Sequence, residues 1–215
     1  MYRLTIGLAL LGGTMALIIV GYVLFVVIDG APGEVFVNVS RAMEPTLLAG
    51  ERFTVRRILD QSSASIRRGE LVTYRWPDDR SRKFVKRIAG LPGDTIAMTA
   101  GHLLVNGRVV PEPYAWLQDS TVDPVLDDSR WQRPYLAGPS ARDTSRYTPS
   151  RDNWGPIVVP AKSFFVLGDN RDNSFDSRYR GFVLRGDILG EVRRVYFSRD
   201  STGGIRWRRL GRRVQ

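Results

Sequence analysis

The first thirty residues differ sharply from the rest of the chain in their hydrophobic pattern. Residues 4–28 form 25 consecutive uncharged positions, which at about 1.5 Å per residue can cross a hydrocarbon layer of ~30 Å. A cleaved secretory signal would instead have an apolar region of about 7 to 15 residues followed by a small-residue cleavage site. The pattern therefore predicts a retained transmembrane helix over residues 4–28, within an N-terminal anchor of residues 1–29.

After a linker at residues 30–33, brief runs of alternating hydrophobic and polar residues are separated by Gly, Pro and Asp. A period of two residues predicts β-strands. The strands expected are 34–39, 52–56, 70–76, 82–89, 94–98, 102–105, 108–110, 157–159, 163–167 and 188–197. The predicted fold class is mostly β, with the transmembrane helix followed by one β-rich domain over residues 30–215.

Residues 111–154 break the alternating pattern. The segment is rich in Asp, Arg, Ser and Pro, and its aromatic residues are scattered. We expect an inserted second lobe, or a long excursion, between two halves of the β core.

The positive charge of the chain lies outside the anchor. The formal net charge is +10, and the anchor contributes only Arg3 and Asp29, which cancel. Arg3 predicts a cytoplasmic N-terminus and a domain on the outer side of the membrane. A basic domain binds nucleic acid or anionic lipid, and beside a membrane anchor we expect phospholipid and no nucleic acid. The basic tail at residues 206–213 fits a lipid or nucleic-acid contact and a solvated terminus equally well.

The near absence of metal-binding residue types excludes several kinds of site. The sequence has no cysteine and one histidine, His102, so disulfides, thiolate metal sites and histidine-rich metal sites are excluded. His102 lies in a Gly-containing turn, where a histidine is typically a surface residue.

Lys86 is a candidate general base. In the extended segment from Lys83, Phe84 and Ile88 share one face with Lys86. Two large apolar neighbours would desolvate the ammonium group and lower its pKa, which lets a lysine act as a base. Without further context, most strand lysines simply extend to water.

The segment Gly168–Arg178 gathers charged and amide side chains directly after an apolar run. Its acidic residues do not follow the spacing of a calcium-binding loop, and arginines intervene. The pattern indicates an ion-paired, hydrogen-bonded loop.

The segment Val37–Gly50 resembles a strand that ends in a tight polar corner, a suitable place to present a nucleophile. Pro45 stops any regular element there. The residue before Met43 is Ala42, whose methyl group has no nucleophilic chemistry.

Together, "SRAMEPTLLAGE", "KRIAGLPGD" and "GDNRDNSFDSR", in this order behind an anchor, resemble the bacterial type I signal peptidases, which are membrane-bound Ser/Lys endopeptidases. The resemblance puts Ala42 at the nucleophilic serine and Ser40 at the serine that helps hold the oxyanion. Met43 is the expected substrate contact, and Met43 and Leu47 are both candidates for an edge that faces substrate or lipid, although buried packing is the default for both.

The same resemblance assigns the remaining site residues. It makes Lys86 the general base, Ser174 the serine that orients the lysine, and Asp176 and Arg178 a supporting ion pair. It implies no metal and no cofactor. The implied activity is removal of signal peptides from preproteins after small residues, in an Ala-x-Ala context.

The alanine at position 42 implies that this chain is inactive, because loss of the nucleophile in a serine protease lowers kcat by roughly 10⁶. Ser40 is no substitute, since a two-residue shift in an extended chain moves a side chain about 6.6 Å. Ala42 is either a deliberate substitution in a working peptidase, which the intact remainder of the site favours, or natural in a non-catalytic relative that binds signal-peptide-like segments. A basic peripheral domain that binds lipid or nucleic acid is the third alternative.

Overall fold

The computed structural model describes residues 13–17, 19–21, 34–58, 66–76, 80–118, 122–126, 129–141 and 143–214. Residues 13–17 and 19–21 are helical. Apart from these, the predicted transmembrane helix at residues 4–28 lies outside the described residues. Within the described ranges, no helix combines the length and the hydrophobicity that crossing a bilayer requires.

Two antiparallel sheets form the domain, which is mostly β as predicted. The larger sheet has the strand order β1-β2-β11-β3-β4-β9-β10 and the smaller has the order β7-β6-β5-β8. The strands of the larger sheet are β1 (Glu34–Val37), β2 (Arg52–Arg57), β3 (Leu71–Arg75), β4 (Lys83–Gly90), β9 (Ser163–Leu167), β10 (Val183–Leu184) and β11 (Ile188–Phe197). Those of the smaller sheet are β5 (Thr95–Thr99), β6 (His102–Val105), β7 (Arg108–Val109) and β8 (Trp154–Val158).

Helical structure in the domain is short. A single α-helical turn, α2 (Ser177–Arg180), follows the charged loop. The 3₁₀ helices are η2 (Ser129–Tyr135), η3 (Gly138–Ala141), η4 (Thr144–Arg146), η5 (Arg171–Asn173), η6 (Arg185–Asp187) and η7 (Trp207–Arg209).

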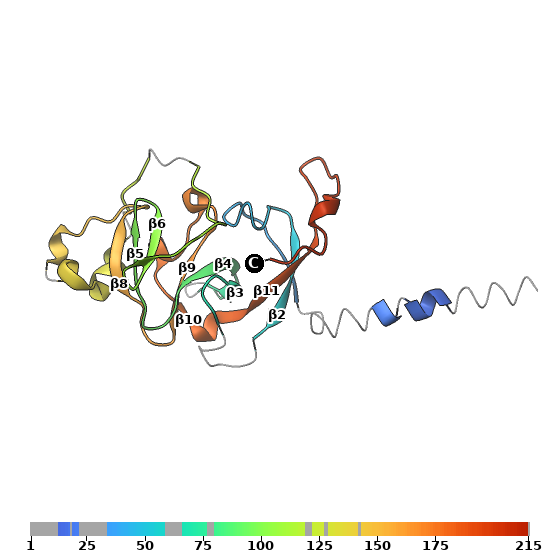
Figure 1. The fold of residues 1–215 in the computed structure, drawn as a ribbon, viewed down its shortest axis with the longest axis horizontal. Helices are drawn as coiled ribbons and strands as arrows, with labels where there is room; N and C mark the ends of the chain where they lie inside the picture. Colours follow the sequence, from blue (N-terminus) through green and yellow to red (C-terminus); the bar gives the residue numbers. More distant parts are fainter. Residues whose placement is uncertain are drawn as a thin grey trace, which may run out of the picture.

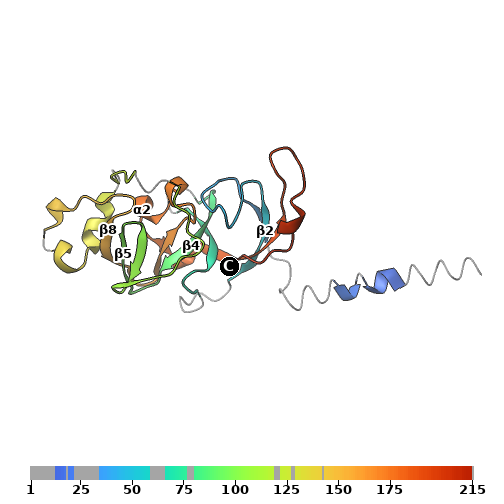
Figure 2. The same ribbon diagram turned by 45° about the horizontal axis from the view of Figure 1, so that its top comes forward.

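The two sheets lie side by side. Figures 1 and 2 show β5 and β8 at one end of the domain and β2 at the other, with β4 between them. The smaller sheet begins at Thr95, so residues 111–154 connect β7 to β8 within one sheet and do not by themselves make up the second lobe.

Three apolar clusters hold the sheets together. One joins the two sheets, since Phe165 and Leu167 of β9 pack with Ile96 and Ile157. A second lies around Tyr74, Ile88 and Phe164, and a third around Met43, Leu47 and Phe53. Strand β9 is buried along its whole length, which explains its uninterrupted apolar sequence.

The larger sheet curves enough to bring β1 across to β4. The sheet order places β2, β11 and β3 between these two strands. Nevertheless, the Lys83 ammonium lies 3.4 Å from the Glu34 carboxylate and 4.9 Å from the centre of the Phe36 ring. The curvature therefore creates a hollow between the two strands.

Candidate active site

Asn38 closes the corner that follows β1. Its main-chain N–H donates to the Glu51 carbonyl at 2.8 Å, and its side-chain amide donates to the carbonyls of Leu47 and Leu48 at 3.2 and 3.0 Å. These bonds fix both ends of the segment that carries Ala42. An asparagine suits this role because its short side chain can satisfy several backbone groups at once.

Met43 and Leu47 attach the corner to the hydrophobic core. Both side chains are completely buried in the cluster around Phe53. The buried packing that is the default for both residues is therefore confirmed, and a substrate contact at Met43 stays a prediction. The apolar side chains are retained by the core because burying each stabilises the fold by about 1.5–3 kcal/mol.

The C-terminal tail holds the far side of the same corner. Arg209 forms an ion pair with the completely buried Glu51 and donates to the carbonyl of Thr46 at 2.9 Å. Ser198 also donates to Glu51, at 2.7 Å. Arg209, which belongs to the basic tail, thus serves as the counterion of a buried carboxylate.

The charged loop after β9 meets the corner through main-chain bonds. The Asn170 N–H donates to the carbonyl of Ala42 at 3.1 Å, and the Asn170 amide donates to the carbonyl of Arg41 at 3.2 Å. Behind these contacts, Arg87 forms a two-pronged pair with Asp169 at 2.8 and 2.7 Å. The pair joins β4 to the loop and thereby fixes the loop against Ala42.

Lys86 projects from β4 into buried surroundings. Its side chain is 4% exposed, and it lies opposite Val72 in the β3–β4 ladder. The pKa of Lys86 is lowered from its ordinary value of 10.5 to about 8, chiefly by burial; the negative charges of Asp176 and Asp169 oppose this shift, and the positive charge of Arg178 adds to it. The direction and its main cause agree with the expectation from the apolar spacing.

Asp176 and Arg178 form a completely buried ion pair beside Lys86. The guanidinium donates to both carboxylate oxygens at 2.9 Å, and the Gly168 N–H donates to the same carboxylate at 2.9 Å. Burial alone would raise the pKa of Asp176, but the positive charges of Arg178 and Lys86 and these hydrogen bonds outweigh it, so the pKa is lowered. Asp176 therefore remains ionised and supplies a fixed negative charge near the lysine.

Ser174 lies between this ion pair and the corner. Its hydroxyl is buried and makes no hydrogen bond among the described residues. A Cβ at Gly168 would lie 2.1 Å from that hydroxyl and 2.6 Å from the carbonyl oxygen of Ala42. Only glycine fits at position 168, and its small size lets Ser174 and Ala42 approach each other.

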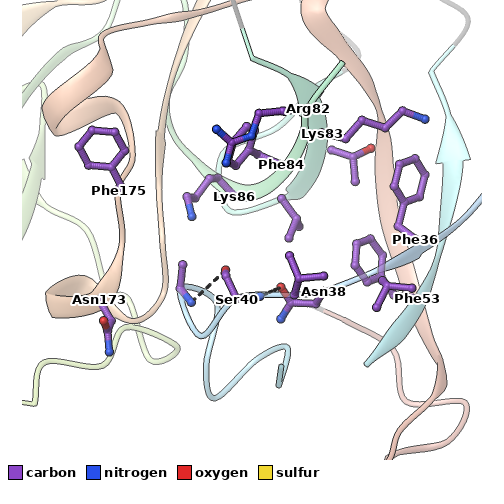
Figure 3. Close-up of a pocket in the computed structure, with 15 residues that line it drawn as sticks. Phe36, Asn38, Ser40, Phe53, Arg82, Lys83, Phe84, Lys86, Asn173 and Phe175 are labelled. Atoms are coloured by element: carbon purple, nitrogen blue, oxygen red, sulfur yellow. Dashed lines mark hydrogen bonds between the residues drawn. The ribbon is translucent and has the colours of Figure 1, made fainter. Parts of the chain in front are cut away.

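A groove of about 450 Å³ joins these residues. Residues 36–40 and 82–86 line it together with Ala42, Asn173 and Phe175. Figure 3 shows Lys86 and Ser40 on facing sides of the groove, with Phe36 at one end and Phe175 at the other. The structure therefore brings the predicted nucleophile position and the predicted base to one cavity.

The Ser40 hydroxyl lies beside Ala42, where its oxygen accepts a hydrogen bond from the main-chain N–H of that residue. The main-chain N–H of Ala42 lies 3.4 Å from the Ser40 hydroxyl, and the contact is drawn in Figure 3. A distance of 3.4 Å is too long for a strong hydrogen bond, and the Ser40 hydroxyl, which accepts this bond, still has a proton of its own to donate. Such paired donors stabilise a developing oxyanion.

The groove runs between two strand edges that have free backbone groups. β1 is the outermost strand of the larger sheet, and β9 pairs with β4 only from Arg87 onward. Within the described residues, the stretch 83–86 of β4 is therefore unpaired on its β9 side. Exposed edges of this kind can pair with an extended peptide.

Several supporting residues carried no recognisable signal in the sequence. Arg87 directly follows Lys86 but points to the opposite face of the strand, and Arg171 forms an ion pair at 2.7 Å with Glu112, which belongs to the segment 111–154. Such pairs join distant segments, so no local spacing reveals them.

His102 is exposed at the start of β6 and lies in neither the groove nor the loop. The described part of the chain contains no cluster of three or more potential metal-ligating side chains.

Comparisons with known proteins agree with this arrangement. Residues 11–197 match the family described as signal peptidase, peptidase S26. Signal peptidase I from Bacillus amyloliquefaciens is 34% identical over 181 residues, covering 84% of each chain. Signal peptidase I P from Bacillus subtilis subsp. natto is 32% identical over 181 residues, covering 84% of this chain and 85% of the relative.

Other relatives are longer than the region matched. A probable signal peptidase I-2 from Synechocystis is 34% identical over 158 residues, and the match covers 71% of this chain but 58% of that protein. A crystal structure of a signal peptidase I from Enterococcus faecalis is 27% identical, with 59% of this chain and 95% of that chain covered and a TM-score of 0.39. From the family match and the two Bacillus relatives, the chain belongs to the signal peptidase family, peptidase S26, a family of serine endopeptidases.

Proposed function

We propose that the chain has the substrate site and general base of a type I signal peptidase but lacks its nucleophile. The proposal rests chiefly on the meeting of Ala42 and the buried Lys86 in one groove. The substrates are preproteins whose signal peptides end in small residues. The chain binds such a segment and leaves its peptide bond intact.

The surrounding residues determine what a serine at position 42 would do. Neutral Lys86 would take the hydroxyl proton while the serine oxygen attacks the substrate carbonyl. The N–H of residue 42 and the Ser40 hydroxyl would donate to the resulting oxyanion. Lys86 would return the proton to the departing amine, forming an acyl-enzyme, and would then activate the water that hydrolyses it.

The other polar residues have supporting roles in this mechanism. Ser174, whose hydroxyl has no partner among the described residues, orients the Lys86 amine. The Asp176–Arg178 pair fixes the loop that carries Ser174.

A second function follows from the same feature. With a methyl group at position 42 and an otherwise intact groove, the chain is suited to capturing signal-peptide-like segments without cutting them. This alternative would make Ala42 a natural residue, whereas a deliberate substitution would make the chain a disabled peptidase.

We also propose the cellular setting. Residues 4–28 anchor the chain in the bacterial plasma or inner membrane, with a cytoplasmic N-terminus and the domain on the opposite side. The basic domain lies against phospholipid, and neither nucleic acid nor a cofactor takes part. The uncharged length of the anchor segment supports the membrane assignment.

Cleavage of a purified preprotein in detergent or liposomes tests the function. The chain itself should bind without cutting, Ala42→Ser should cut, and Ala42→Ser combined with Lys86→Ala should not. If Ala42→Ser cuts nothing while the preprotein still binds, the capturing function replaces the enzymatic one. If the preprotein does not bind, both functions are refuted.

A further inference from the structure

A second hollow opens at one rim of the curved larger sheet. It has a volume of about 210 Å³ and shares Phe36 and Lys83 with the groove. Its charged lining residues all lie at strand ends: Glu34 begins β1, Arg57 ends β2, Arg75 ends β3 and Lys83 begins β4. Because neighbouring strands of this sheet are antiparallel, these four ends belong to the same rim.

Two of the cations face each other across adjacent strands. Arg75 and Lys83 are direct partners in the β3–β4 ladder, so their side chains lie on the same face of the sheet. Like charges directly opposite each other destabilise a sheet. An anion bound between the two side chains would relieve this repulsion.

The hollow contains three cations but one carboxylate. Glu34 lies 3.4 Å from Lys83 and 3.7 Å from Arg57, so its single negative charge is shared between them. Arg75 has no carboxylate partner among the residues that the structure describes. The side chains of Arg57 and Lys83 are 72% and 42% exposed, so a ligand can reach both. The formal balance of the hollow is therefore +2, and it is accessible.

Apolar surface adjoins this positive charge. The walls of the hollow include Phe36, Val55 and Leu189. On the adjoining strand β1, Val35 and Val37 are 52% and 53% exposed. A ligand that combines negative charge with apolar groups therefore fits this rim better than a free inorganic anion does.

The chain enters the domain at this rim. Glu34, the first residue of β1, follows Ile28, the last residue of the proposed anchor, by six positions. Six extended residues span at most about 20 Å, so the rim lies within that distance of the end of the anchor. The headgroups of the surrounding phospholipids are therefore within reach of the hollow.

We propose that Arg57, Arg75 and Lys83 bind the phosphate of an anionic phospholipid headgroup in this hollow. The inference rests on the proposed membrane setting and goes beyond it by naming the charge of the lipid and the residues that hold it. The three side chains donate hydrogen bonds to the phosphate oxygens, and the acyl chains lie beside the exposed valines of β1.

The position of the hollow gives the bound lipid a role in substrate capture. Phe36 and Lys83 line both the hollow and the groove. Figure 3 shows these two residues at the end of the groove away from Phe175, and the Lys83 ammonium lies 4.9 Å from the centre of the Phe36 ring. A headgroup held there keeps this end of the groove at the membrane surface, where signal peptides arrive.

Calorimetric titration of the full chain in a non-ionic detergent tests the proposal. The ligands are dioctanoyl phosphatidylglycerol, dioctanoyl phosphatidylcholine and inorganic phosphate. Phosphatidylcholine has the same acyl chains without a net charge, and inorganic phosphate has the charge without acyl chains. The variants are Arg57→Gln, Arg75→Gln, Lys83→Gln and Glu34→Gln. The control is Arg108→Gln, which removes one positive charge from the exposed β7 of the other sheet.

Phosphatidylglycerol should bind more tightly than either of the other two ligands. Loss of each cation of the hollow should weaken its binding roughly fivefold, because one Lys or Arg near an anionic surface contributes about 1 kcal/mol. Glu34→Gln should strengthen the binding, a gain that misfolding cannot produce, and Arg108→Gln should leave it unchanged.

Three results would overturn the proposal. The first is equal Kd values for phosphatidylglycerol and phosphatidylcholine. The second is inorganic phosphate binding as tightly as phosphatidylglycerol, which would make the hollow a site for free phosphate. The third is a loss of affinity in Arg108→Gln as large as that in Arg57→Gln, which would identify a general charge effect.

Binding of a preprotein separates this inference from the proposed function. Arg57 and Arg75 do not line the groove, so Arg57→Gln and Arg75→Gln should bind the preprotein as the unsubstituted chain does. Preprotein binding without any preference for phosphatidylglycerol would overturn the lipid site and leave the proposed function intact. A chain that stays monodisperse without detergent would refute the membrane setting and the lipid site with it.

Discussion

The buried ammonium group of Lys86 leads to a stability prediction that can be measured without any catalytic activity. Replacing Lys86 with methionine keeps a similar length and volume but removes the charge. The pKa of Lys86 falls from its ordinary 10.5 to about 8, chiefly through burial. At 1.36 kcal/mol per pKa unit this corresponds to about 3 kcal/mol, the amount by which the protonated lysine destabilises the fold below pH 8.

The pH dependence follows from the sign of this shift. Between pH 8 and 10.5 the unfolded chain binds a proton at Lys86 that the folded chain does not, so the stability of the unsubstituted protein rises with pH. Lys86→Met lacks this contribution. Its advantage should therefore be about 3 kcal/mol at pH 6–7 and should disappear through the window from pH 8 to 10.5.

Urea unfolding of both proteins at pH 6 to 10, in the same detergent, measures the difference. Groups that position 86 does not affect cancel in this comparison, and Asp176, whose pKa Lys86 helps to lower, is ionised across this pH range. Lys162→Met is the matched control because Lys162 is exposed, so this substitution removes the same charge from the surface of the domain. Parallel pH profiles for Lys86→Met and the unsubstituted protein would refute the conclusion that Lys86 loses its charge near pH 8.

Three further predictions follow from the site. In Ala42→Ser, kcat/KM should rise about tenfold per pH unit below pH 7 and level off above about pH 9, because neutral Lys86 is the active form; a profile that is flat from pH 6 to 9 would exclude Lys86 as the base. Gly168→Ala should destabilise the fold by roughly 1–3 kcal/mol and abolish cleavage in the Ala42→Ser background, because its Cβ would lie 2.6 Å from the carbonyl oxygen of Ala42; normal unfolding and cleavage curves would show that the corner can yield. Arg209→Leu should lower the free energy of unfolding by about 3 kcal/mol, because Glu51 would remain buried without a counterion; adding Glu51→Gln should recover part of this loss, and no recovery would mean that Arg209 acts through packing alone.

Much of the fold could be predicted where the sequence pattern is strong. The expected strands 102–105, 163–167 and 188–197 have the same bounds as β6, β9 and β11. β8 begins at Trp154, whereas the expected strand begins at residue 157. The expected start is late because Gly155 and Pro156 disfavour a strand, but β8 is an edge strand, where both residues are tolerated. The two-residue β10 and the single-turn α2 are too short to leave a periodic signal.

The candidate site was predictable only in part, for a physical reason. The burial of Lys86 follows from its apolar neighbours two residues away on either side, which is local information. The ion pair between Glu51 and Arg209 and the fit of Gly168 against Ala42 depend on segments that only the folded chain brings together. The sequence alone leaves Met43 open between a substrate edge and the core, because its place in the core depends on Phe53 and Val195, which lie elsewhere in the chain.

The ion pair between Glu51 and Arg209 also determines when the corner can be completed. The two residues are 158 positions apart, so at 5–20 residues per second a ribosome makes Arg209 roughly 8 to 30 s after Glu51. Throughout that interval the Glu51 carboxylate lacks the Arg209 counterion, and burying an unpaired carboxylate is unfavourable. The segment carrying position 42 is thus among the first parts of the domain to be synthesised and among the last to take its final form.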